Sequence, residues 1–403
     1  MVFHMLTRIS CLVCTLLICI SGHNVPAQTS AREFQRLLTD QGGLDAADFA
    51  TLERRQTVVK LGPVSDRREV AVVGVVNIRA GADEFLRSYR AGMTRKNNAA
   101  ILEIGSFAKV PALSDLQNLT VEAKDIEDLK ECVVGNCQIK LSAAMIERFR
   151  NEIDWQADDY SVNATNLFKQ MLLDYVRDYR ARGEQALIAY NDKRNEIALA
   201  SEQNTLDASS SYVNNVLATR QSEFSLIEDA IVWSKIKFGL KPVLAVNHVR
   251  IYRRERDLGP QVVVTSKQIY ANHYFNASLA LTAFVTVPDS AQSSYLVYEN
   301  RSRADGLGGP FSKIKRRVVE KKALEGLKAI LEHSKASLDG PPASARAADL
   351  SMHQPSGWGH RLFGGIRPLL WILVLSALIA LLVLGRNGTG RKGKSLKPES
   401  AKS

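Results

Sequence analysis

The sequence has none of the short motifs that mark common hydrolase, zinc or nucleotide-binding sites. It lacks His-Glu-x-x-His, which would place two metal ligands and a general base on one helix, and no serine stands in Gly-x-Ser-x-Gly. The glycine-rich segment 305–310 has neither the Lys-Ser or Lys-Thr ending of a P-loop nor the spacing of a dinucleotide fingerprint. The sequence therefore predicts no catalytic residue, no metal site and no cofactor.

Cysteine is also scarce, with five in 403 residues. Three of them, Cys11, Cys14 and Cys19, lie in an apolar stretch near the N-terminus. The other two, Cys132 and Cys137, are separated by Val-Val-Gly-Asn, whereas a redox-active pair usually has two intervening residues. No further Cys or His surrounds them to complete a metal site. We predict a structural disulfide between Cys132 and Cys137, formed in an oxidising compartment.

Long apolar runs are absent except at the two ends of the sequence. The first, Ile9 to Ile20, follows Arg8 and precedes Val25-Pro26-Ala27, which suits signal peptidase. We predict a signal peptide over residues 1–27, cleaved after Ala27. The alternative is an uncleaved anchor helix, but the run is shorter than the roughly twenty apolar residues that a bilayer requires.

The second run, Pro368 to Gly385, contains no charged residue. As a helix it would extend about 27 Å, close to the thickness of the hydrocarbon layer. Basic residues dominate the segment after it, 386–403, which predicts a cytoplasmic tail. We therefore expect a single-pass protein of the cell membrane, in contact with the lipid bilayer. Its large N-terminal body would lie outside the cytoplasm, in the periplasm if the source is bacterial.

The formal net charge of +11 includes the basic tail and Arg8. Much of this excess is explained by membrane topology, so we predict no nucleic-acid partner. The tail contributes Arg386, Arg391, Lys392, Lys394, Lys397 and Lys402.

Periodicity divides the exported body into five parts. They are N-terminal helices (28–65), a strand-helix part with the disulfide loop (66–141), a helical insertion (142–239), antiparallel strands with a long helix (240–339) and a flexible stalk (340–367). Within the insertion, apolar spacing predicts a helix over 224–238, and the polar segment 201–211 is expected to be a connection.

The strand predictions rest on residues with a period of two. Segment 70–78 is apolar at nearly every position and reads as a strand buried on both faces. Segment 275–285 alternates apolar residues with Asn276, Ser278 and Thr282, as expected of a sheet with one buried and one solvated side. A leucine stripe predicts a long helix over 312–337. The predicted fold class is α+β: an antiparallel sheet with a long C-terminal helix, a helical insertion and one C-terminal transmembrane helix.

The order of these elements in residues 67–90 and 240–338 resembles the helix-grip fold of the START and polyketide-cyclase-like superfamily. The resemblance covers less than half of the chain and rests on element order, and the insertion at 142–239 departs from it. It implies a cavity between sheet and helix that holds lipids or other apolar small molecules. The whole chain is also similar to bacterial exported proteins with one C-terminal span.

Two segments are candidate binding sites. Gly306, Gly308 and Gly309 precede a helix N-terminus and could bind an anion, although a tight turn explains the glycines more simply. Lys313, Arg316 and Arg317 begin that helix and could meet anionic headgroups, or could form a solvated face.

Three functions remain open from the sequence. The first is non-enzymatic binding of a lipid or apolar small molecule. The second is a scaffold of the cell envelope that contacts a protein partner. The third is a hydrolase with an unfamiliar site near His248 and His273, which stand on successive strand-like segments.

Overall fold

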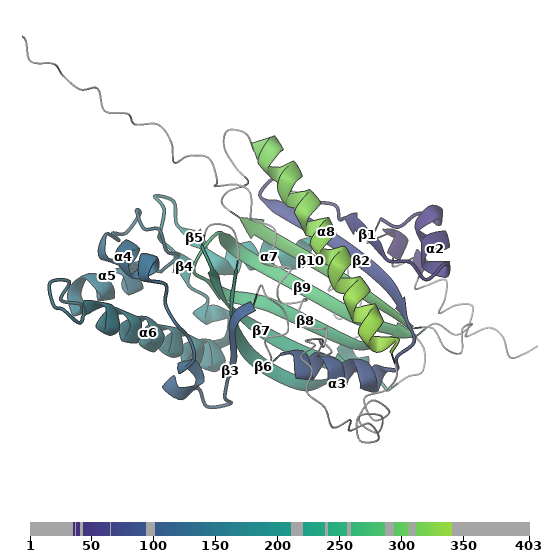
Figure 1. Ribbon diagram of the computed structural model, residues 1–403, viewed down its shortest axis with the longest axis horizontal. Helices are drawn as coiled ribbons and strands as arrows, with labels where there is room; N and C mark the ends of the chain where they lie inside the picture. Colours follow the sequence, from purple (N-terminus) through teal and green to yellow (C-terminus); the bar gives the residue numbers. More distant parts are fainter. Residues whose placement is uncertain are drawn as a thin grey trace, which may run out of the picture.

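The structure is a computed structural model, and it describes residues 35–36, 38–40, 43–64, 66–93, 101–210, 221–237, 241–255, 259–286, 294–304, 307 and 312–340. Its centre is an eight-stranded sheet in which every neighbouring pair is antiparallel, in the order β1-β2-β10-β9-β8-β7-β6-β3 (Figure 1). The strands are β1 (Val58–Leu61), β2 (Glu69–Ile78), β3 (Ile101–Phe107), β6 (Ser225–Ile236), β7 (Val243–Arg253), β8 (Gly259–Ala271), β9 (Phe275–Thr286) and β10 (Ser294–Ala304). A separate two-stranded ladder joins β4 (Ala189–Tyr190) to β5 (Ile197–Ala198).

Helices pack against both faces of the sheet. They are α2 (Ala46–Glu53), α3 (Ala82–Gly92), α4 (Ala123–Lys130), α5 (Ala143–Glu152), α6 (Tyr160–Arg182), α7 (Leu199–Ser209) and α8 (Ser312–Leu338), with short 3-10 turns at Leu113–Leu116, Gly183–Ala186 and Gln221–Glu223. The α8 face, which carries Val72, Val249, Val264, Phe284 and Leu296, packs against α3 and α8. The α6 face, which carries Val75, Ile231, Val246, Tyr270 and Leu279, packs against the helices from α4 to α7 and, near β1, against Leu52 of α2.

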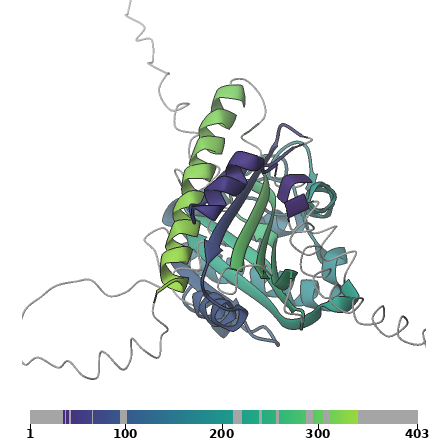
Figure 2. The ribbon, with the colours of Figure 1, turned by 90° about the vertical axis from the view of Figure 1, so that its right-hand side faces the viewer.

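The long helix α8 lies along β2 on the α8 face, as the front of Figure 1 and the rotated view of Figure 2 agree. Near the start of the helix, Arg316 Nη1 donates to the carbonyl oxygens of Arg67 and Glu69 at 2.9 and 2.8 Å. Near its end, Lys335 Nζ donates to the carbonyl oxygen of Asn77 at 2.5 Å. The buried stripe of α8, which includes Leu327 and Leu331, therefore rests directly on the edge half of the sheet.

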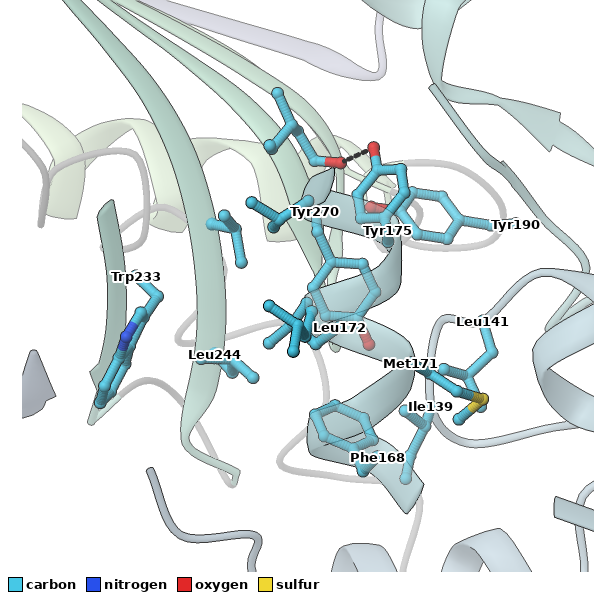
Figure 3. Packing of buried hydrophobic residues seen from close by; sticks show 14 of the residues in the cluster. Ile139, Leu141, Phe168, Met171, Leu172, Tyr175, Tyr190, Trp233, Leu244 and Tyr270 are labelled. Atoms are coloured by element: carbon cyan, nitrogen blue, oxygen red, sulfur yellow. Dashed lines mark hydrogen bonds between the residues drawn. The ribbon is translucent and has the colours of Figure 1, made fainter. Parts of the chain in front are cut away.

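The opposite face is held by α6. Phe168, Leu172 and Tyr175 of that helix point toward Leu244 and Tyr270 of the sheet (Figure 3). The Tyr175 hydroxyl donates to the Ile269 carbonyl oxygen at 2.6 Å, and burial raises the pKa of this phenol well above its ordinary value. A buried tyrosine needs such a partner, because an unmet hydroxyl in the core is costly.

The predicted fold class is right in its α+β character, its large antiparallel sheet and its long helix after the last strand, but its transmembrane helix is a correction. In the part of the chain that the structure describes, no helix is both long and apolar enough to cross a membrane. The longest, α8, has 27 residues but exposes lysine, arginine and glutamate along its outer side. The predicted span from Pro368 to Gly385, the signal peptide and most of the stalk lie outside the described residues.

Three local predictions are also wrong. Segment 224–238 is not a helix, because Ser225–Ile236 forms β6 between β3 and β7. The expected connection at 201–211 is mostly α7. The polar side of segment 275–285 does not face solvent: Ser278 and Thr282 are each 1% exposed. Helices cover both faces of β9, so its polar row is enclosed in the core.

Candidate ligand-binding site

The α8 face carries a buried set of neutral polar side chains over its central strands. Strand register places Asn247 of β7 opposite Gln268 of β8, Ser278 of β9 opposite Ser302 of β10, and Thr282 opposite Val264. Directly opposed residues share a face of the sheet, so these side chains all lie on the side of α3 and α8. Each of the five polar residues is buried.

Some of these side chains form hydrogen bonds with one another or with their neighbour Asn300. The hydroxyls of Ser278 and Ser302 are 2.9 Å apart, and Ser302 Oγ donates to Asn300 Oδ1 at 2.9 Å. Asn300 Nδ2 reaches Ser278 Oγ at 3.4 Å. These three residues of β9 and β10 hydrogen-bond to one another, as expected for polar groups in a packed core.

Three other polar atoms of this set have no hydrogen-bond partner. Asn247 Nδ2, Gln268 Nε2 and Thr282 Oγ1 are buried without one, although their residues are only 3%, 2% and 1% exposed. A buried polar atom without a partner costs about 1 to 3 kcal/mol, and buried polar groups in folded proteins nearly always have one. Three such atoms on neighbouring strands of one face therefore indicate a place where water or a ligand supplies the missing partners.

A fourth such atom comes from α3. Tyr89 is 2% exposed, its hydroxyl has no partner, and burial raises its pKa. The Tyr89 ring lies beside that of Phe85, with centroids 6.0 Å apart, and Phe85 stacks on Phe284 of β9 at 5.6 Å. Phe284 is on the same face of β9 as Thr282, two residues farther along. Tyr89 thus lies on the side of the sheet that carries Thr282.

The three atoms on the strands define two polar positions. The Asn247–Gln268 pair occupies one row, with Cα atoms about 5 Å apart across the strands. The second position is Thr282 of β9, which stands opposite Val264 of β8. Val264 is four residues from Gln268, a distance of about 13 Å along the strand. Between the two positions the face presents Val249, Ser266 and Ala280. The arrangement suits an elongated, mainly apolar molecule with a polar group at one or both ends.

The sequence-predicted binding residues lie elsewhere. Gly306, Gly308 and Gly309 are outside the described residues. Arg316 is bound to backbone carbonyls near β2 and to Glu320 at 2.6 Å, so it has a structural role. Lys313 and Arg317 are exposed on the outer side of α8. None of the three cations contributes to the polar set on the α8 face.

The two histidines occupy separate clusters. His248 lies between the Tyr179 hydroxyl, 2.9 Å from Nδ1, and Asp229, 3.0 Å from Nε2. Burial lowers its pKa, with Arg250 acting in the same direction, and together they outweigh the opposite effect of Asp229. His273 contacts Asp125 at 3.0 Å and the Gln138 carbonyl oxygen at 3.2 Å. The structure does not bring His248 and His273 into one site.

The predicted disulfide is confirmed: Cys132 and Cys137 are bonded, with Cα atoms 4.5 Å apart. Gly135, at the turn between them, has φ of 85°, a conformation that favours glycine. Its amide donates to the Asn191 carbonyl oxygen at 2.7 Å, so the loop is tied to the segment after β4. Within the described ranges, no group of three or more His, Cys, Asp or Glu side chains is placed to hold a metal ion.

Sequence reasoning missed the residues of the site for one identifiable reason. The polar positions of 275–285 were read as solvent-facing because an antiparallel sheet often has one wet side. The pattern of β9 alone does not distinguish a wet row from a buried one. The same two-residue alternation puts Asn247 and Gln268 among Val243, Val249 and Val264, and that apolar context was the available signal.

No protein-family model, no curated protein and no solved structure matches this chain.

Proposed function

We propose that this protein is a non-enzymatic binding protein for a lipid or another small molecule with an apolar body. The ligand would lie on the α8 face, over β7, β8 and β9, beside α3 and α8. The observation that carries the proposal is the set of unpartnered, buried atoms Asn247 Nδ2, Gln268 Nε2 and Thr282 Oγ1. The resemblance to helix-grip proteins, which is also a proposal, agrees with this location.

The chemistry of the site favours binding over catalysis. Its polar members are amides and hydroxyls, which orient a ligand through hydrogen bonds but are poor proton-transfer groups near neutral pH. Apolar neighbours such as Val249, Ile251 and Val264 supply the larger part of the binding surface. Each amide that gains an acceptor oxygen on binding recovers part of the cost of its burial.

The proposal is tested on full-length protein by extracting the folded chain with organic solvent and identifying the extract by mass spectrometry. A pyrene-labelled fatty alcohol then serves as the probe in a fluorescence titration. We expect saturable binding that Asn247→Leu combined with Gln268→Met weakens about tenfold or more, because two hydrogen bonds are lost. Thr265→Val, which changes the same strand on the α6 face, is the matched control and should bind normally.

An empty extract together with non-saturable titration would overturn the proposal. Equal affinity of the double variant and the wild type would overturn its location. Circular dichroism of both variants establishes that they are folded before the titration.

We also propose that the protein acts outside the cytoplasm. The Cys132–Cys137 disulfide supports this, because such bonds persist in oxidising compartments. Alkylation of protein from freshly lysed cells should find both thiols blocked; rapid labelling of both would count against export.

A further inference from the structure

The sheet separates charged from neutral side chains by face. Along the described strands, the α6 face carries lysine, arginine, histidine and glutamate, among them Lys235, His248, Arg250, Lys267, Glu299, Arg301 and Arg303. On the α8 face, the same strands present Ser234, Asn247, Val249, Gln268, Tyr298, Asn300 and Ser302 at the alternate positions. The segregation follows from the two-residue period of a strand.

Only the rim of the α8 face carries charge in the described strands. Glu228 of β6 and Arg253 of β7 lie where the sheet meets α3. Glu228 accepts from Arg90 Nε at 2.6 Å, and Arg253 Nη1 donates to Asp83 at 2.6 Å. Both charges are thus matched by residues of α3 and are not available to a ligand in the interior.

The helices that cover this face are neutral where they are buried. α3 contributes Phe85, Leu86 and Tyr89, and α8 contributes Leu327, Ile330 and Ser334. His333 of α8 has a buried, unpartnered Nε2, and burial lowers its pKa, which favours the uncharged imidazole. No described side chain is placed to neutralise a ligand charge between the two polar positions.

Resting on the proposed function, we infer that the ligand is electrically neutral: an apolar molecule that carries hydroxyl, ester or amide oxygens. Its oxygen atoms would accept from Asn247 Nδ2 and Gln268 Nε2, and a second oxygen would accept from Thr282 Oγ1. A carboxylate, phosphate or ammonium group would lose its hydration here without meeting an opposite charge, which costs far more than burying a neutral oxygen that is hydrogen-bonded.

The test compares probes that share one alkyl chain and differ only in the end group: an alcohol, a methyl ester, a carboxylate and a trimethylammonium. Each is delivered below its micelle concentration and competes with the pyrene-labelled alcohol on the full chain. We expect the alcohol or the ester to bind at least about tenfold more tightly than either charged probe. Equal or tighter binding of the carboxylate or the ammonium would overturn the inference while leaving the proposed function intact. Absence of saturable binding by all four probes would overturn the proposed function instead.

A charge-introducing variant gives a second, independent measurement. Gln268→Lys places an ammonium beside Asn247 and should move the preference toward the carboxylate. Thr265→Lys adds the same charge to the α6 face of the same strand and should leave the preference unchanged. If Gln268→Lys does not fold, the wild-type comparison alone decides. A folded Gln268→Lys that still prefers the alcohol to the same degree would contradict the assigned site.

Discussion

At the scale of single residues, the structure distinguishes polar side chains that are buried with partners from those buried without them. Ser278 and Thr282 provide the sharpest comparison, because both lie on β9, on the same face, and both are 1% exposed. Ser278 Oγ bonds Ser302, whereas Thr282 Oγ1 has no partner. Their replacement by apolar residues of similar size therefore should have opposite consequences.

We predict that Thr282→Val leaves the free energy of unfolding unchanged or raises it by about 1 kcal/mol, since no hydrogen bond is lost and an unmet hydroxyl is removed. Ser278→Ala should lower it by about 1 kcal/mol, because its partners in the cluster are left unmet. Urea denaturation of ligand-free protein measures both. A larger loss for Thr282→Val than for Ser278→Ala would show that the threonine hydroxyl has a partner in the folded protein.

At the scale of elements, close approach between α8 and β2 fixes the position of the helix. A Cβ atom added at Gly74 would stand 2.4 Å from Leu331 Cδ1 and 2.9 Å from Leu327 Cδ2. Distances this short require the helix or its leucines to move, so glycine at this position allows the contact. Gly81, before α3, has nothing within 4 Å of the same hypothetical atom and a φ of −85°.

Gly74→Ala is expected to lower the free energy of unfolding by about 1 to 3 kcal/mol, as overpacking of a core does. This loss should exceed any gain from replacing glycine in a strand. Gly81→Ala is the control and should cost less than about 1 kcal/mol, the small loss expected when alanine replaces glycine at a helix N-cap. Thermal and urea unfolding of both variants test this; equal behaviour would mean that α8 does not rest on β2 as described.

The individual strands and helices also show how much of the fold could be predicted from the sequence. Strand β2 was predicted from an almost continuous apolar run, β9 from clear two-residue alternation and α8 from its leucine stripe. β6 was mistaken for a helix because it is buried on both faces from Ile231 to Ile236, and apolar residues at 227, 230, 231 and 233 also fit a helical stripe. Its β-branched residues were the better guide.

α7 was missed for the opposite reason, since half of the residues it buries are polar: Glu202 and Gln203 beside Leu199 and Leu206. Gln203 Nε2 donates to the carbonyl oxygens of Gln268 and Ser278, and Glu202 binds Arg303 at 2.7 Å. Partners so distant along the chain cannot be identified from local periodicity. The unpartnered atoms of the candidate site likewise depend on which strands are neighbours, which one sequence alone does not specify.

At the scale of the whole molecule, charges on the α6 face join the sheet to its covering elements. Arg301 of β10 is 1% exposed and binds Glu299 and Glu69, each at 2.6 Å. Glu299 also accepts from Ser210, which follows α7, at 2.7 Å. Arg303 links Glu202 of α7 to Asp66, at 2.7 Å each. Two arginines on one strand thus hold α7 and the segment before β2 to the same side of the sheet.

Replacement of Arg301 tests how much this charge network contributes to the free energy of unfolding. Arg301→Met leaves Glu69 and Glu299 buried without their cation, and we expect a loss of about 3 to 5 kcal/mol in the free energy of unfolding. Arg148→Met, which breaks an exposed pair with Glu152, is the control and should cost far less.

The loss should also depend on pH in a defined direction. Burial raises the pKa of Glu69 above its ordinary 4.5, with Arg301 opposing that effect, and the variant removes the opposition. An acid whose pKa is higher in the folded state stabilises the fold below its unfolded pKa and loses that contribution as pH rises through the folded value. The deficit of Arg301→Met relative to wild type should therefore be smaller at about pH 5 than at about pH 8.

Adding Glu69→Gln and Glu299→Gln should recover at least half of the lost stability and remove the pH dependence, because no unpaired carboxylate remains. Urea titrations across this range decide the matter, and a deficit that grows toward low pH would contradict the buried carboxylate as its cause.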